Sequence, residues 1–212
     1  MKTKSKALLL TLCAVLLVAA SVLGTMAYLT STDKVENTFT VGNVKITLDE
    51  AKVNPDGTLV AGADRVKANE YKLMPGHTYT KDPTVHVDAN SEDSYIFVKV
   101  ENGIADFEAT SGVADDYLTI TDQMKDKGWT PLESADGYGV YYKVYIKGAE
   151  GASNDLTVFE KFRIAGDANT RDGWGDISNA KIIVKAYAVQ KDGFDTAEAA
   201  WTATSGTFTA GN

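Results

Sequence analysis

The sequence predicts an all-β fold, an antiparallel β-sandwich with one short C-terminal helix. Apolar residues recur at every second position through most of the chain, which is typical of strands with one buried face. Turn-forming residues separate these segments at short intervals. Only one segment, near the C-terminus, has the composition of a helix.

Six segments show the alternation. In 94–101 it places Ile96, Val98 and Val100 on one face, and in 181–189 it does the same for every even-numbered residue. The six sequences are GNVKITL (42–48), TVHV (84–87), SYIFVKVE (94–101), YGVYYKVYIKG (138–148), LTVFEKFRI (156–164) and KIIVKAYAV (181–189). Each is expected to form a half-buried strand.

Turns and one helix complete the pattern. The sequence VNPDGTLV predicts a turn from Asn54 to Gly57, because proline restricts φ and glycine accepts a positive φ. ESADGYG (133–139) and GDANTRDGWGD (166–176) are expected to be loops. DTAEAAWTA is expected to be the helix, with Asp195 as its N-cap.

The N-terminus has the layout of a signal peptide. Three lysines precede an uncharged stretch, residues 7–32, whose most apolar part ends at Ala20. The small residues Thr25 and Ala27 predict cleavage between Ala27 and Tyr28, so that residues 1–27 are a leader and no membrane span remains. An uncleaved anchor is the alternative, because the uncharged stretch is long enough to cross a bilayer. Both readings place residues 28–212 outside the cytoplasm, as a single domain.

Charge and cysteine content exclude several classes of function. Removing three of the 21 basic residues leaves 18 against 29 acidic residues, a net charge of −11. This acidity argues against binding to nucleic acid or to anionic membranes. The single cysteine, Cys13, lies in the leader after the large residue Leu12, which does not suit a lipidation site. The mature chain therefore has no disulfide and no thiol chemistry.

No catalytic or cofactor site is identified, so we do not expect an enzyme. The two histidines are His77 in a turn and His86 on a strand, and neither belongs to an HExxH motif. Alternation places His86 on the outer face, with Thr84 and Asp88, as an ordinary solvated residue. There is no GxSxG motif. The many carboxylates carry no spacing that singles out a catalytic pair.

One loop is a weak candidate for a calcium site. Oxygen ligands for Ca²⁺ are available from Asp167, Asn169, Asp172 and Asp176. The spacing does not fit an EF-hand, and a polar loop stabilised by its own side chains is the preferred interpretation. Trp174 in this loop is expected to anchor it to the core, although an exposed platform for sugar binding is the alternative.

Two blocks of the sequence carry a resemblance to a known family. The first is GTMAYLTSTDKVENTFTVGNVKITLDE (24–50), with Phe39 and the stretch from Gly42 to Ile46. The second is LMPGHTYTKDPTVHVDANSEDSYIFVKV (73–100), similar to a family turn and the strands after it; Leu73, Pro75, Gly76 and Lys81 match. Together the two blocks, about a quarter of the chain, resemble the TasA/camelysin family.

The resemblance implies a jelly-roll-like sandwich, secreted by a Gram-positive bacterium and processed by the signal peptidase SipW. For the TasA branch it implies self-assembly into fibres of the biofilm matrix, with other matrix proteins as further partners. The camelysin branch is described as a metallo-endopeptidase, for which this sequence shows no motif. The alternative function is a monomeric surface protein, either a carbohydrate-binding sandwich or such a peptidase.

Residues 28–39 are expected to be a strand donated to a neighbouring subunit. Alternation places Leu29, Val35 and Phe39 on one face, interrupted by Ser31 and Asp33. Such a stripe is too weak to form a strand alone, but suits docking on an open sheet edge. The alternative is that residues 28–39 form the first strand of the sandwich itself.

Overall fold

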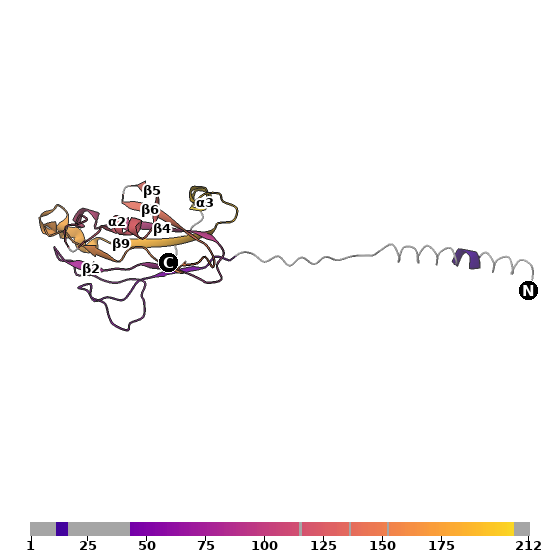
Figure 1. Cartoon of the computed structure of the whole chain (residues 1–212), viewed down its shortest axis with the longest axis horizontal. Helices are drawn as coiled ribbons and strands as arrows, with labels where there is room; N and C mark the ends of the chain where they lie inside the picture. Colours follow the sequence, from indigo (N-terminus) through magenta and orange to yellow (C-terminus); the bar gives the residue numbers. More distant parts are fainter. Residues whose placement is uncertain (1–11, 17–42, 115, 136, 152, 206–212) are drawn as a thin grey trace, which may run out of the picture. The chain divides into compact units, whose positions relative to one another are not determined.

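The chain folds mostly into strands, arranged in three antiparallel sheets with a few short helices (Figure 1). The computed structural model describes residues 12–16, 43–114, 116–135, 137–151 and 153–205. The all-β class predicted from the sequence is therefore confirmed.

The sheets combine strands that are distant in the sequence. The largest has the order β5-β6-β4-β9, the second β1-β3-β7, and the third pairs β2 with β8. The strands are β1 (Ile46–Asp49), β2 (Thr78–Thr80), β3 (Thr84–Val87), β4 (Ser94–Asn102), β5 (Thr130–Ala135), β6 (Tyr138–Tyr145), β7 (Asp155–Thr157), β8 (Lys161–Arg163) and β9 (Ile182–Gln190). The α-helices are α2 (Ile120–Asp126) and α3 (Ala197–Thr204), and the 3-10 helices are η1 (Ala105–Phe107), η2 (Ala168–Thr170) and η3 (Trp174–Asn179).

The inner faces of the sheets meet in one core. Strand β4 contributes Ile96 and Val98, which are fully buried, and β3 contributes Val85. The even-numbered residues of β9 from Ile182 to Ala188 pack against the same core, as the alternation predicts. On the other face of the four-stranded sheet, Phe97 packs against Trp201 of α3, with ring centroids 5.1 Å apart. Both faces of β4 are thus covered.

Helix α2 shows that the expectation of a single helix was wrong. Thr119 is its N-cap, with the side-chain oxygen accepting from the backbone N–H of Asp122. The buried residues Ile120, Gln123 and Met124 have helical spacing. Seven residues give only two turns, too few for the period to stand out in the sequence. The C-terminal helix α3 is where we expected it, but its N-cap is Thr196 rather than Asp195.

The expected loop at 133–139 is instead the tip of a hairpin. Strands β5 and β6 pair antiparallel, and Gly137 has a φ of 81° between them. The short polar strand β5 carries too little apolar alternation to be identified from its sequence. The turn at Asn54 to Gly57 is confirmed, since the N–H of Gly57 donates to the carbonyl of Asn54 at 2.8 Å.

The N-terminal predictions mostly lie outside the described residues. Residues 12–16 are helical and Cys13 is exposed. The cleavage site at Ala27 and Tyr28 and the whole assembly segment, including Leu29, Val35 and Phe39, are not among the described positions. Within the described part of the chain, every helix is too short or too polar to cross a membrane.

Candidate functional site

A groove of about 1410 Å³ runs between the edge strands of the two larger sheets. Strand β1 lines one side, β9 lines the other, and the extended segment 67–73 completes it. The apolar part of the lining includes Ile46, Leu48, Tyr71, Leu73, Phe162, Ile177, Ile182, Val184 and Ala186. Charged side chains, among them Glu50, Lys67, Lys81 and Lys185, line the rest. This combination of an apolar lining and two sheet edges suits an extended peptide.

The edge of β9 that faces away from β4 carries backbone groups that pair with no strand in the described part of the chain. Backbone N–H groups of Gly103 and Lys191 donate to the carbonyls of Lys181 and Asp93, one bond at each end of the β4–β9 ladder. The register between them is continuous, and antiparallel residues alternate between bonded and non-bonded pairs. Odd-numbered residues of β9 therefore bond β4. Even-numbered residues from Ile182 to Gln190 direct their N–H and C=O groups to the open edge, where no described strand pairs with them.

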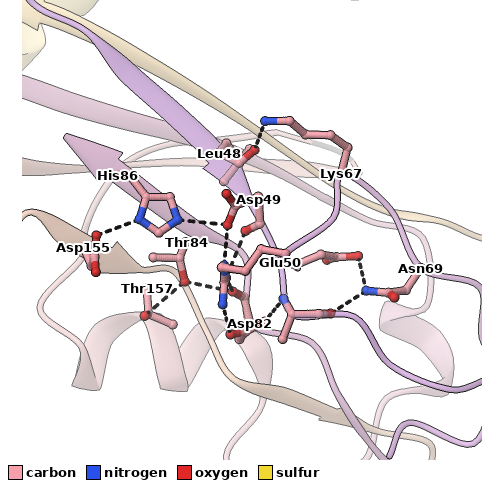
Figure 2. Close-up of polar contacts among 12 residues, drawn as sticks. Leu48, Asp49, Glu50, Lys67, Asn69, Asp82, Thr84, His86, Asp155 and Thr157 are labelled. Carbon is pink, nitrogen blue, oxygen red and sulfur yellow. Dashed lines mark hydrogen bonds and ion pairs between the residues drawn. The ribbon is translucent and has the colours of Figure 1, made fainter. Parts of the chain in front are cut away.

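The edge of β1 is partly occupied. The residue directly after β1 is already paired, because Glu50 and Val66 exchange two backbone hydrogen bonds, of 2.9 and 2.7 Å. The carbonyl of Leu48 accepts a hydrogen bond from the Lys67 ammonium at 2.6 Å (Figure 2). Charged side chains at a strand edge discourage further pairing. Of the two edges, β9 is therefore the more open one.

The inner face of β9 carries two small side chains, of which Ala186 lines the groove. On the inner face of β9, Ala186 lies opposite Val98 and Ala188 lies opposite Ile96. Larger residues here would project toward β1, whose Ile46 and Leu48 are also only partly buried. Side chains of an incoming strand thus have apolar surface to cover.

A polar cluster lies on the outer face of the β1-β3-β7 sheet, next to the groove. His86 sits between two carboxylates, with Nδ1 2.6 Å from Asp155 Oδ1 and Nε2 2.9 Å from Asp49 Oδ1 (Figure 2). Arg65 contacts Asp49 through Nε and donates to Asp82 at 2.9 Å. These contacts connect β1, β3, β7 and the 50–67 loop.

The charges of this cluster support one another. Burial lowers the pKa of His86, but hydrogen bonds to Asp155 and Asp49 outweigh it and leave the pKa raised. Burial raises the pKa of Asp49, and the contacts with Arg65 and His86 outweigh that effect, so it ends below its usual value. Both ring nitrogens of His86 can donate only when the imidazole is protonated.

The structure places His86 on the outer face, as predicted, but held by two carboxylates rather than simply solvated. His77 lies in a turn, where its backbone N–H donates to the carbonyl of Met74 at 3.2 Å. No group of three or more histidine, cysteine or acidic side chains in the described part of the chain is arranged to hold a metal ion.

The candidate calcium loop is structured by its own contacts. Asp167 accepts a hydrogen bond from Arg171 at 2.7 Å, and all four candidate ligands, Asp167, Asn169, Asp172 and Asp176, are exposed. Trp174 packs edge-on against Phe107, with centroids 5.7 Å apart, which agrees with the anchor interpretation. Gly173 has a φ of 81°, a conformation that favours glycine.

Sequence reasoning did not identify the groove. It depends on which strands lie at sheet edges, and alternation does not carry that information. The pair Ala186 and Ala188, in a row of inward-facing positions otherwise held by larger residues, is the signal that could have indicated it.

Comparison with family models, with curated proteins and with solved structures finds no match for this chain.

Proposed function

We propose that the protein is a secreted structural subunit that assembles into extracellular fibres of a biofilm matrix or cell surface. Each subunit donates residues 28–39 to the groove of the next. The proposal includes a jelly-roll-like sandwich, secretion by a Gram-positive bacterium, cleavage after Ala27 by the signal peptidase SipW, and copies of the same chain as the main partner. Other matrix proteins are further candidates.

The open edge of β9 is the observation that carries this proposal. Five alternate residues of β9, the even-numbered ones from Ile182 to Gln190, direct backbone groups away from β4 beside a partly apolar groove. A donated strand adds to such an edge through main-chain bonds, while its side chains fill the groove. Residues 28–39 match this in length, and Leu29, Val35 and Phe39 supply the apolar face.

A stable contact between subunits needs both the backbone hydrogen bonds and the burial of apolar side chains. About half a dozen ladder bonds, at a net 0.5–1.5 kcal/mol each, add about 3–9 kcal/mol. Three large apolar side chains add about 1.5–3 kcal/mol each when fully buried. Association itself costs about 4–15 kcal/mol, so neither contribution alone gives a stable contact.

Truncation tests the proposal. The mature chain beginning at Tyr28 is compared with a chain beginning at Thr38, by size-exclusion chromatography and electron microscopy. We expect the mature chain to form polymers and the truncated chain to remain a folded monomer. A matched pair of variants refines the test, since Val35→Asp and Thr32→Asp add the same charge to opposite faces of the segment. Only Val35→Asp is expected to prevent assembly.

Other outcomes distinguish the alternatives. If the truncated chain unfolds, residues 28–39 are the first strand of the domain's own core. If the truncated chain still polymerises, strand donation by this segment is wrong. A mature chain that stays monomeric at all concentrations favours a monomeric surface protein that binds carbohydrate or cleaves peptides.

A further inference from the structure

Glu50, the residue after β1, contacts two nitrogen-bearing side chains at the wall of the groove. The residue is only 4% exposed, and the side chain of its partner Lys81 is 11% exposed. Glu50 Oε2 contacts Lys81 Nζ. Glu50 Oε1 accepts a hydrogen bond from Asn69 Nδ2 at 2.9 Å (Figure 2). The amine of Lys81 and the amide of Asn69 therefore both contact the buried carboxylate of Glu50.

The amide of Asn69 is held in a fixed orientation. Its Oδ1 accepts from the backbone N–H of Val53 at 3.0 Å, and Nδ2 also donates to the carbonyl of Ala51 at 2.8 Å. A donor on the carbonyl oxygen stabilises negative charge that develops there when a nucleophile attacks the carbon. Contacts to Glu50 and Ala51 orient the amide nitrogen as a leaving group.

We propose that Lys81, Glu50 and Asn69 form an intramolecular cross-linking site, at which the chain joins Lys81 Nζ to Asn69 Cγ as an amide. The three residues also line the groove, but the reaction does not require strand donation.

The chemistry needs no further reactant. Lys81 gives one proton to Glu50, and the neutral amine attacks Cγ of Asn69. Glu50 then passes that proton to Nδ2, the Cγ–Nδ2 bond breaks, and ammonia leaves. The nitrogen that became the new amide releases its remaining surplus proton to solvent. Carbon, nitrogen and charge balance, and nothing is oxidised or reduced.

The surroundings favour this reaction over a simple ion pair. Tyr71, which follows the Asn69 segment, packs edge-on against Tyr79 and Phe162, with centroids 5.9 and 5.2 Å apart. Tyr71 and Phe162 line the same groove as Glu50 and Lys81, and apolar rings beside a charge pair reduce the stabilisation that it gains from water. The product would tie segment 67–73, one side of the groove, to the residue after β2. A mature chain without cysteine has no disulfide for this purpose.

Intact-mass spectrometry of the mature, folded protein tests the inference. We expect a mass lower than that of its sequence by one ammonia, and a proteolytic fragment in which Asn69 and Lys81 are joined. Lys81→Arg keeps the positive charge beside Glu50 but removes the nucleophile, so it is expected to have the full mass. Asn69→Ala is expected to have the full mass of its own sequence as well.

Asn102 provides the matched control. Its Nδ2 donates to Glu108 at 3.0 Å, but the groups bonded to the other oxygen of Glu108 are Tyr117 and the N–H of Ile120. It also precedes Gly103, a pair prone to losing ammonia by ring closure. Asn102→Ala is therefore expected to keep the missing mass. A wild-type protein of full mass, or a deficit that persists in Asn69→Ala, would overturn the inference.

Discussion

Replacing Ala186 by proline separates the role of β9 in the monomer from its role in assembly. Ala186 is in the even-numbered set whose N–H groups face the open edge, so proline there removes no bond to β4. Proline is tolerated on edge strands when the missing N–H faces outward. We therefore expect the free energy of unfolding of the monomer to change by less than about 1 kcal/mol.

We expect Ala186→Pro to weaken assembly, although it leaves the stability of the monomer nearly unchanged. The variant removes one donor from the acceptor edge and places the proline ring where the donated strand approaches. A lost bond with its partner left unsatisfied costs about 1–3 kcal/mol. That range corresponds to roughly 5- to 150-fold weaker association for each subunit contact. The critical concentration for polymerisation, measured by sedimentation, should rise by a similar factor.

Lys185→Pro is the matched control. Lys185 lies opposite Lys99 in the bonded register, so proline at this position breaks the β4–β9 ladder. We expect a lower melting temperature for Lys185→Pro and a nearly unchanged one for Ala186→Pro. If Ala186→Pro polymerises at the wild-type concentration, β9 is not the acceptor edge. If Ala186→Pro unfolds the monomer, the assignment of its N–H to the open edge is wrong.

Four further predictions concern stability and processing. The pKa of His86 is raised in the folded state, so its stabilising charge is present below about pH 6.5, its unfolded value, and is lost as pH rises through the folded value. His86→Gln should therefore lower the free energy of unfolding more at pH 6 than at pH 9, by under about 1 kcal/mol because the pair is partly exposed, and denaturant titration at the two pH values measures this. Gln123 is buried and bonds four backbone groups from the 118 and 160–161 regions, so Gln123→Ala should cost about 2–3 kcal/mol in a denaturant titration. Chelation with EDTA should leave the melting temperature unchanged, and a drop of more than a few degrees would indicate calcium at Asp167 to Asp176. N-terminal sequencing of the secreted protein should begin at Tyr28, and a start beyond Thr32 would contradict the proposed cleavage.

The sequence predicted which segments form strands better than it predicted which strands and side chains lie next to one another. Alternation identified β4, β6 and β9 and the inward-facing set on β9, because burial of one face imposes a period of two on local sequence. It also placed His86 on the outer face. It could not indicate the two carboxylates around that histidine, since Asp49 and Asp155 are 37 and 69 residues away. Which strands become edges is likewise a property of the pairing, not of any one segment.

Local signals also failed where elements are short. Helix α2 has a good N-cap at Thr119, yet two turns do not establish a period against the surrounding strand pattern. Strand β5 is mostly exposed and carries Pro131, so its own residues give little indication of pairing with β6. In both cases tertiary contacts decide the conformation.

Hydrogen exchange at β9 tests the assembly account most directly. In the truncated monomer beginning at Thr38, the amides of Val184, Ala186 and Ala188 should exchange faster than those of Ile183 and Lys185, which bond β4. In polymers of the mature chain, we expect the even-numbered amides to become protected as well. Even-numbered amides that exchange equally fast in monomer and polymer would contradict strand donation to β9.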